Sequence, residues 1–298
     1  RFNVGPFPAV RLPALPFLIS RLLAMLSRRD FLRLTGAVAA STPFLSASSW
    51  REAASGGTFT ELRRGVGIYT ERGGTIGWLL TDDGGVVVDT QSPRTAPNCR
   101  RGLRERSDAA LAFVVNTHHH ADHTGGNGVF APHTERIVAH EAAPALQRQA
   151  YGSSDDAPEQ VYAGTTFSEE WTETVGDETI RLRHHGPAHT GGDAVLFFER
   201  ANVVHGGDLI FNRAYPFIDV EGGANTANWI ATLETLHETY DDDTQFIFGH
   251  GNPEFGVTGD RADLLVMRDF FVSLREYVTQ QRQAGASLSE MKQKTTLE

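Results

Sequence analysis

Residues 116–128 read NTHHHADHTGGNG and follow directly on an apolar run, AFVVN, at 112–116. From position 118 to position 123 the chain carries four histidines and one aspartate, and glycines follow at once. Imidazole and carboxylate side chains are the donors that borderline divalent ions such as zinc take in proteins. Loops at strand ends present reactive groups on a rigid scaffold. The stretch therefore predicts a metal site beside a strand.

The spacing within this histidine stretch predicts how its side chains divide. In extended backbone, residues two apart point to the same side, so we expect His118 and His120 to hold one ion together. Asp122 and His123 come after the chain bends and are expected to face a neighbouring ion. His119 points to the other side, and we interpret it as a structural residue or a support for the ligands.

Ligands for two ions must also come from other parts of the chain, and three later stretches have the right character. His189 lies in GPAHTGGD, Asp208 in HGGDLIF and His250 in FIFGHGN, each at the edge of an apolar run and flanked by glycines. Glycine lets backbone segments approach one another closely. Asp89 ends a further apolar run, VVVDT. These four residues are candidate partners of the histidine stretch.

Short apolar runs recur along the chain and are typical of strands, because they are rich in β-branched and aromatic residues and bounded by turn residues. Strands are predicted at 66–70, 76–80, 86–90, 112–116, 136–140, 179–184, 194–199, 202–206 and 245–250. Amphipathic helices are predicted at 225–240, where Asn225 or Thr226 can cap the start, and at 261–283. Interleaved strands and helices favour an α/β sandwich with sheets inside and helices outside.

The ordered set HxHxDH, then His, Asp and His, with the earlier Asp of VVVDT, resembles the metallo-β-lactamase superfamily over about residues 60–255. The resemblance implies an αββα sandwich, which is an α/β fold of two mixed sheets flanked by helices. It implies a first metal ion held by His118, His120 and His189, and a second held by Asp122, His123 and His250. Asp208 would bridge the two ions, and Asp89 would orient a ligand or the loop.

Two adjacent divalent ions lower the pKa of a shared water towards about 7 and supply hydroxide near neutral pH. The resemblance therefore implies a dinuclear metal-dependent hydrolase that uses a metal-bridged hydroxide on a small-molecule substrate. Asp122 is the expected catalytic residue, because it would steer the proton of that water. Two zinc ions are the expected cofactors, and iron or manganese is the alternative.

Two positions bear on the substrate. Asp208 and Phe211 stand where the commonest lactamase branch has a cysteine and a lysine that binds the drug's carboxylate. The seven-ligand pattern with a bridging Asp is more similar to glyoxalase-II-type and lactonase-type hydrolases, so a small ester, lactone or related substrate is expected. β-Lactamase activity stays an alternative, since Arg213 could replace the missing lysine. The aromatic stretch 211–225 is a candidate wall of the cleft.

A second class of function is an oxidoreductase. Sulfur dioxygenases of the same fold hold one iron with two His and one Asp, a set contained in His118, His189 and Asp208. The flavodiiron branch is excluded, because it has Glu where this chain has His120. A metal-binding protein without activity is a third class, which the complete ligand set disfavours. Two zinc-type ions per chain would favour hydrolysis, whereas one iron would favour oxygen chemistry.

Charge and cysteine content exclude other classes. The 298-residue chain has a formal net charge of −10, whereas nucleic-acid binding needs a basic face, so no nucleic-acid partner is expected. The single cysteine, Cys99, excludes an internal disulfide and a Cys-rich zinc site and is expected to be buried. The remaining histidines match no ligand motif and are interpreted as structural: His133, His140, His184, His185, His205 and His237.

Residues 1–55 are predicted to be an N-terminal extension with an export signal, and residues 56–298 one domain ending in a helix. SRRDFLR at 27–33, before a short apolar stretch at about 34–45, resembles a bacterial twin-arginine signal. That stretch is too short to cross a bilayer, so no stable membrane span is expected. We expect translation to start at Met25 and the twin-arginine translocon to carry the folded protein to the periplasm or medium.

Overall fold

The computed structural model describes residues 56–152 and 159–294, so the predicted export signal lies outside the described residues. Their largest sheet has seven strands, in spatial order β1 (Thr58–Arg63), β2 (Val66–Thr70), β3 (Ile76–Leu80), β4 (Gly85–Val88), β5 (Leu111–Asn116), β6 (Ile137–His140) and β7 (Thr165–Phe167). Neighbouring strands are antiparallel from β1 to β4 and parallel from β4 to β7.

A second sheet has six strands, in spatial order β15 (Thr258–Gly259), β13 (Gln245–Ile247), β11 (Val203–His205), β10 (Val195–Phe198), β9 (Glu178–Arg183) and β8 (Glu170–Val175). β11 and β13 are parallel, and the other neighbours are antiparallel. A short parallel pair, β12 (Phe211–Asn212) with β14 (His250–Gly251), forms a third sheet. Both large sheets are therefore mixed, as the resemblance implied.

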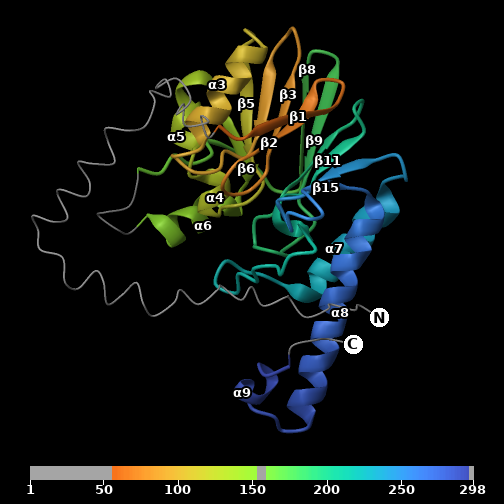
Figure 1. The fold of residues 1–298 in the computed structure, drawn as a ribbon. Coiled ribbons are helices and arrows are strands. Elements are labelled where there is room, and N and C mark those ends of the chain that lie inside the picture. Colours follow the sequence, from red (N-terminus) through yellow and green to blue (C-terminus); the bar gives the residue numbers. More distant parts are fainter. Residues whose placement is uncertain (1–55, 153–158, 295–298) are drawn as a thin grey trace, which may run out of the picture. The chain divides into compact units, whose positions relative to one another are not determined.

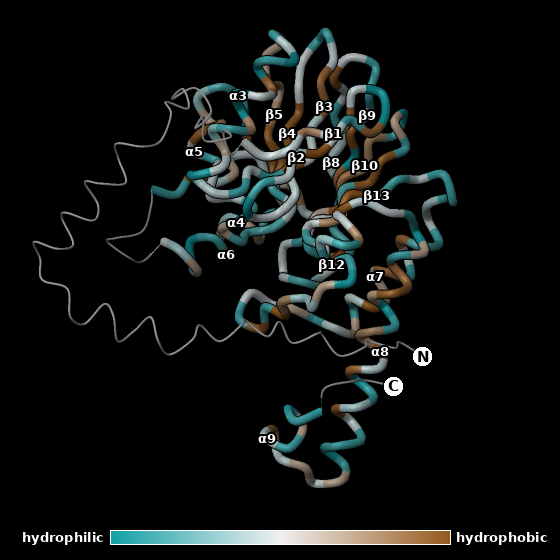
Figure 2. The backbone as a smooth tube through the Cα atoms, in the orientation of Figure 1, coloured by the Kyte–Doolittle hydropathy of each residue, from teal (hydrophilic) through white to brown (hydrophobic). Residues whose placement is uncertain are grey.

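The two large sheets pack face to face and bury an apolar core between them. Alternate residues of a strand point to opposite faces, so every second side chain of the central strands enters this core. The main contributors are Val86, Val88, Phe113 and Val115 from the first sheet, and Ile180, Leu182, Leu196 and Phe198 from the second. Figure 2 shows β5 and β10 in the brown of hydrophobic residues.

Helices cover both outer faces of this sandwich (Figure 1). Against the first sheet lie α3 (Ala96–Arg106) and α5 (Asn127–Phe130), and their buried residues include Cys99, as expected. Against the second sheet lie α7 (Thr226–Thr239) and α8 (Arg261–Gln283), which bury Trp229, Leu233 and Phe271 against its strands. The four layers confirm the predicted αββα sandwich.

The other helices are short. They are α4 (Ala121–Thr124), α6 (Ala142–Tyr151), α9 (Leu288–Met291) and the 3-10 turns Ala131–His133 and Gly207–Leu209. In the described part of the chain, no helix combines the length and the hydrophobicity that a membrane crossing requires.

The nine predicted strands and both predicted long helices are present, with ends that shift by a residue or two. The exception is the stretch 245–250, where β13 stops at Ile247 and His250 opens the separate strand β14. β1, β8, α3 and α6 are elements that the sequence patterns missed.

The fold brings the candidate ligands together through its parallel strands. β4 and β5 are parallel in the first sheet, and β11 and β13 are parallel in the second. The carboxyl ends of parallel strands lie at one edge of a sheet, which is where ligands bind in such folds. Asp89 follows β4, the histidine stretch follows β5, Asp208 follows β11 and His250 follows β13.

Candidate metal centre

The first cluster of ligand-type side chains joins the two sheets. Nδ1 of His120 lies 3.0 Å from Nε2 of His118 and 3.1 Å from Nε2 of His189. Oδ2 of Asp208 lies 3.8 Å from Nε2 of His118 and 3.5 Å from Nε2 of His189. Three imidazoles and one carboxylate therefore point their ligand atoms at one small volume, with each atom within 4.8 Å of the others.

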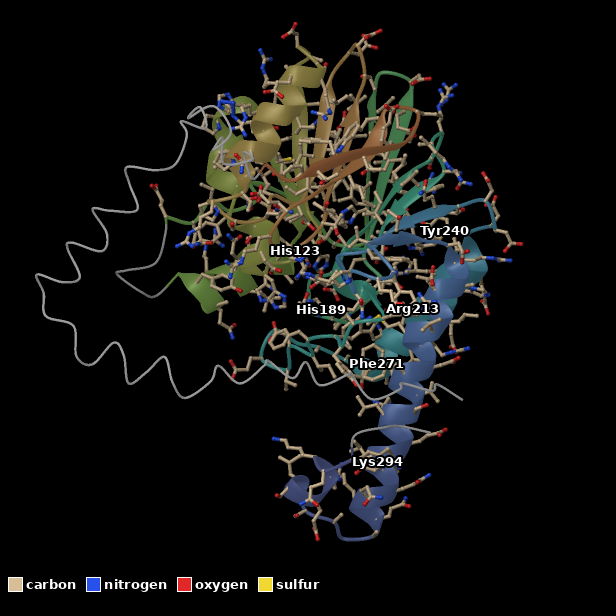
Figure 3. All side chains as sticks on the ribbon, in the orientation of Figure 1. His123, His189, Arg213, Tyr240, Phe271 and Lys294 are labelled. Carbon is tan, nitrogen blue, oxygen red and sulfur yellow. The ribbon has the colours of Figure 1, made fainter. Side chains whose placement is uncertain are left out.

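The second cluster lies beside the first. Nε2 of His250 is 3.2 Å from Oδ2 of Asp122 and 3.3 Å from Nε2 of His123. The other oxygen of Asp208, Oδ1, is 3.0 Å from Nε2 of His123. Asp208 thus faces both clusters, and all seven residues singled out from the sequence meet at this edge of the fold. Figure 3 shows two of them, His123 and His189, near each other where the two halves of the sandwich meet.

Local backbone structure explains how four residues of one short stretch serve two clusters. His118 lies in a bend that follows β5, and His120, with ψ of 148°, stands at the start of α4. The single turn of α4 then directs Asp122 and His123 to the neighbouring cluster. The ligand atoms divide between the clusters as predicted, although residues 117–119 form bends and not the extended backbone that the spacing argument assumed.

The proton positions in the first cluster fit a bound cation. His120 presents Nε2 to the carboxylate of Asp219 at 2.9 Å. Because a carboxylate only accepts hydrogen bonds, Nε2 carries the proton, and in the neutral imidazole Nδ1 then carries a lone pair. His189 presents Nδ1 to the carbonyl oxygen of Phe217 at 3.0 Å, which leaves a lone pair on its Nε2. These two lone pairs face each other at 3.1 Å. In the neutral imidazoles such a contact is repulsive, and a proton or a metal cation between the nitrogens would relieve it.

The second cluster fits a cation for a similar reason. Nδ1 of His123 lies 2.7 Å from Oδ2 of Asp89, which directs Nε2 towards Asp208 and His250. Oδ1 of Asp208 is buried and has no hydrogen bond of good geometry. A divalent ion would satisfy this oxygen and the facing nitrogens at once.

The electrostatics of the metal-free protein favour positive charge at this second cluster. Burial would raise the pKa of Asp208, but the His123 and His118 imidazoles hold it well below its usual value. Burial would lower the pKa of His123, yet the Asp208 and Asp89 carboxylates raise it well above its usual value. Hydrogen bonds to Asp122 and Asp208 likewise outweigh burial and raise the pKa of His250 to about 9. In contrast, burial lowers the pKa of His189 to about 4.

Asp89 holds the histidine stretch against β4, as expected. Its two carboxylate oxygens accept hydrogen bonds from the backbone N–H and the hydroxyl of Thr117, both at 2.8 Å, while Oδ2 also meets His123. Asp89 itself has a left-handed backbone, with φ of 65°. A non-glycine residue in that region is strained, and the bonds to Thr117 and His123 hold it there.

Asp219 is a site residue that the sequence patterns did not single out. Its Oδ2 lies 2.9 Å from Nε2 of His120 and 3.4 Å from Nε2 of His119. His119 is buried against this carboxylate and lies outside the two clusters above, but it forms a third group of converging ligand atoms with His120 and Asp219. The only sequence signal was an acidic residue in the glycine-rich stretch DVEGGAN, which is a common loop composition.

The aromatic stretch after β12 forms a wall of the site. The ring of Phe211 stacks on His250 with centroids 5.2 Å apart, and the ring of Phe217 lies 5.6 Å from that of His120. Arg213 does not face the clusters. It donates to Asp263 and Asn212 at 2.7 Å each, and its guanidinium lies over the Phe255 ring. Figure 3 shows Arg213 beside α8.

The remaining histidines take no part in the ligand-type clusters of the described residues. His205 is buried and contacts the carbonyl oxygen of Thr75. His140 stacks on His184 with ring centroids 3.8 Å apart, and His237 contacts the carbonyl oxygen of Arg261. Structural roles fit these contacts.

The fold and the paired clusters have a counterpart among known families. The chain belongs to the metallo-beta-lactamase superfamily, whose model matches residues 69–294. It is 34% identical over 159 residues to the 2,4-dinitroanisole O-demethylase subunit alpha of Nocardioides sp. (strain JS1661), which is 52% of this chain and 46% of that protein. The chain thus spans less than half the length of this relative.

Two further relatives are lactamases. Metallo-beta-lactamase IND-1 of Chryseobacterium indologenes is 22% identical over 174 residues, which cover 58% of this chain and 70% of that protein. The solved structure of a metallo-beta-lactamase from Pontibacter korlensis matches with a TM-score of 0.59 at 18% identity, covering 72% of this chain and 98% of the other. The structural match concerns the fold.

Proposed function

We propose that this chain is a dinuclear metal-dependent hydrolase of a small ester, lactone or related substrate, with zinc as the expected metal. The observation that carries the proposal is the position of Asp208 between two clusters. Its Oδ1 lies 3.0 Å from His123 and its Oδ2 lies 3.5 Å from His189. Oδ2 also lies 3.4 Å from Nε2 of His250, so this one carboxylate meets both clusters, as a bridge between two ions must.

Two divalent ions held there would lower the pKa of a shared water and polarise the substrate's carbonyl oxygen. Asp122 is the residue placed to take the proton, since its side chain is 43% exposed and its Oδ2 lies 3.2 Å from Nε2 of His250. Burial would raise the pKa of Asp122, but His250 and His123 bring it below its usual value. The carboxylate is therefore ionised near neutral pH and able to accept a proton.

The second cluster argues for hydrolysis over one-iron oxygen chemistry. An iron held by His118, His189 and Asp208 would leave Asp122, His123 and His250 without a role, although their ligand atoms converge. The names of two relatives, an O-demethylase of 2,4-dinitroanisole and a metallo-beta-lactamase, point to small molecules. They support a small-molecule substrate here.

β-Lactam hydrolysis is the second candidate, and the similarity to lactamases favours it. The contacts of Arg213 argue against it. To bind a drug's carboxylate, this residue would have to leave Asp263, Asn212 and Phe255. Phe211, which stands at the lysine position, offers no charge. We therefore expect β-lactams to be poor substrates.

The test is a substrate panel on zinc-loaded full-length protein, with metal counted by elemental analysis. The panel contains esters, lactones, thioesters, phosphodiesters, sulfate esters and β-lactams. The proposal expects about two ions per chain and fastest turnover among esters or lactones. Faster turnover of a nitrocefin-type β-lactam than of every other class would contradict it. One iron per chain with oxygen consumption would contradict it as well.

We also propose export through the twin-arginine route, supported by the motif SRRDFLR at 27–33. The test replaces Arg28 and Arg29 by lysine and follows the protein by cell fractionation. The expected result is retention in the cytoplasm. Unchanged export of the lysine variant would remove the proposal.

A further inference from the structure

Large apolar side chains are exposed beside the metal centre. Among the described residues, three such side chains fall within six positions of the loop between β12 and α7: Tyr215 is 85% exposed, Phe217 61% and Val220 77%. We call these three residues the apolar rim. Outside this loop, only Phe255 and Leu288 belong to the same class in the described part of the chain. Exposed apolar residues gathered next to a site mark ligand contacts more often than isolated ones do.

The loop that carries the apolar rim is tied to the turn that holds His189. The N–H of Gly191 donates to the carbonyl oxygen of Gly222 at 2.7 Å, and the N–H of Asn225 donates to that of Ala188 at 2.8 Å. The carbonyl oxygen of Phe217 meets Nδ1 of His189 at 3.0 Å. The rim therefore has a defined position relative to the clusters, although its side chains point into solvent.

Two aromatic rings lie against the ligands themselves. They are the ring of Phe211 on His250 and the ring of Phe217 against His120. Further along the same loop, Val220 follows Asp219, the partner of His120, and the Tyr215 ring packs against Phe270 on α8. A substrate whose reacting carbonyl lies at the clusters would place its neighbouring group beside these side chains.

We infer that the apolar rim binds an apolar acyl or aryl group next to the scissile bond, so that the enzyme selects esters and lactones with bulky apolar substituents. The inference rests on the proposed hydrolase function. Covering the exposed rim removes apolar area from water, which stabilises the complex in proportion to the area covered. Short, polar substrates gain nothing from this contact.

A second copy of the chain is a less suitable occupant. A stable interface buries roughly 800 Å² on each partner, and three side chains of six consecutive positions supply much less. A single substrate group is matched to a surface of this size. Self-association is nevertheless one of the outcomes that the experiment below distinguishes.

The experiment compares full-length wild type, the double variant Tyr215→Ser/Val220→Ser and the control Leu288→Ser, which changes an exposed apolar residue on α9. Phe217 is left intact because it touches His120. We would measure kcat/KM for p-nitrophenyl hexanoate, p-nitrophenyl acetate and ethyl acetate. Intrinsic ester reactivity cancels, because each ester is compared between proteins. The rim variant is expected to lose about tenfold in the ratio of hexanoate to ethyl acetate, while the control keeps the wild-type ratio.

A second measurement needs no turnover. The neutral dye N-phenyl-1-naphthylamine should bind wild type and Leu288→Ser with a fluorescence increase that the rim variant loses. If rim-dependent dye binding persists but no ester is hydrolysed, the proposed function fails and the apolar binding surface stands. Equal ratios and equal dye binding in all three folded proteins would overturn the inference. So would sedimentation showing a wild-type dimer that the rim variant converts to monomer.

Discussion

Oδ2 of Asp219 lies 2.9 Å from Nε2 of His120, the ring nitrogen that faces away from the first ligand cluster. A carboxylate behind a metal-binding imidazole fixes the ring's orientation and its tautomer. Asp219 is itself held by the N–H of Gly222 at 2.9 Å. The loop between β12 and α7 therefore supports the first cluster as well as bordering it.

Replacing Asp219 by asparagine should weaken metal binding about 10- to 100-fold, the usual cost of losing such a partner. The fold should persist, because Asp219 is a half-buried loop residue outside the apolar cores. Zinc competition with a chelator of known affinity measures the change. The exposed neighbour Glu221 provides the matched control, Glu221→Gln, which should bind zinc like wild type. Equal affinities of the two variants would show that Asp219 does not orient His120.

Replacing Asp208 should separate a bridging ligand from an ordinary one. Asp208→Ala removes both oxygens that face the clusters, so we expect loss of both ions and nearly all activity. Asp208→Asn keeps the size but only one oxygen, so about one ion per chain is expected. Elemental analysis and circular dichroism of the purified variants are the measurements. Two ions per chain in Asp208→Ala would rule out the bridging assignment.

Gly207 joins β11 to Asp208 in a conformation that other residues enter with strain. Its φ is 53°, and a Cβ there would lie 2.7 Å from Oγ1 of Thr117, the residue before His118. Gly207→Ala should cost about 1–2 kcal/mol of backbone strain and about 1–3 kcal/mol of overpacking. Gly256→Ala is the control, because its φ is 73° but nothing lies within 4 Å.

Thermal unfolding distinguishes the two glycine variants. For a domain of this size, each kcal/mol lowers Tm by about 2–4 °C. Gly256→Ala should therefore lose a few degrees, and Gly207→Ala clearly more, with weaker zinc binding in addition. Indistinguishable melting temperatures would mean that the contact with Thr117 relaxes without cost.

Metal affinity should rise with pH. In the metal-free protein, His250 is protonated at pH values below its pKa of about 9, and the pKa of His123 lies well above its usual value. Ligands must be deprotonated to bind, so each proton displaced should cost about tenfold in affinity per pH unit below these pKa values. Affinity is therefore expected to fall from pH 8 to pH 6. Zinc competition at pH 6, 7 and 8 tests the slope, which His250→Gln should reduce by about one proton. A flat profile in the wild type would contradict the charge distribution described above.

The sequence could predict those strands that are buried on both faces, because their residues form continuous apolar runs. β4 and β5 bury nearly all their residues and read as apolar runs. β8 lies at a sheet edge, with Glu170, Thr172 and Thr174 exposed or half-exposed, and lacks such a run. In α3 the buried face consists of Ala96, Cys99, Gly102 and Leu103, so small residues hide its apolar stripe.

The candidate ligands were predictable because they lie at or near the ends of predicted strands, where local spacing carries the information; His189 lies in the glycine-rich turn before β10. Asp219 was not predictable, because it lies in an irregular loop and reaches His120 through long-range packing. The same limit applies to Arg213. Its spacing from Phe211 allowed it to face the cleft, and only the contacts with Asp263 and Phe255 direct it elsewhere.

Each ligand cluster combines residues from both halves of the sandwich. The geometry of the site therefore depends on how the two sheets pack against each other. His118 and His123 move with the first sheet, whereas His189, Asp208 and His250 move with the second. Leu196→Ala would leave a cavity in the shared core and so permit a small shift between the sheets. Such a shift changes the distances between the ligand atoms of the two sheets directly. Catalysis depends on such distances far more steeply than folding does. Turnover should therefore fall even at temperatures where the Leu196→Ala variant is still folded.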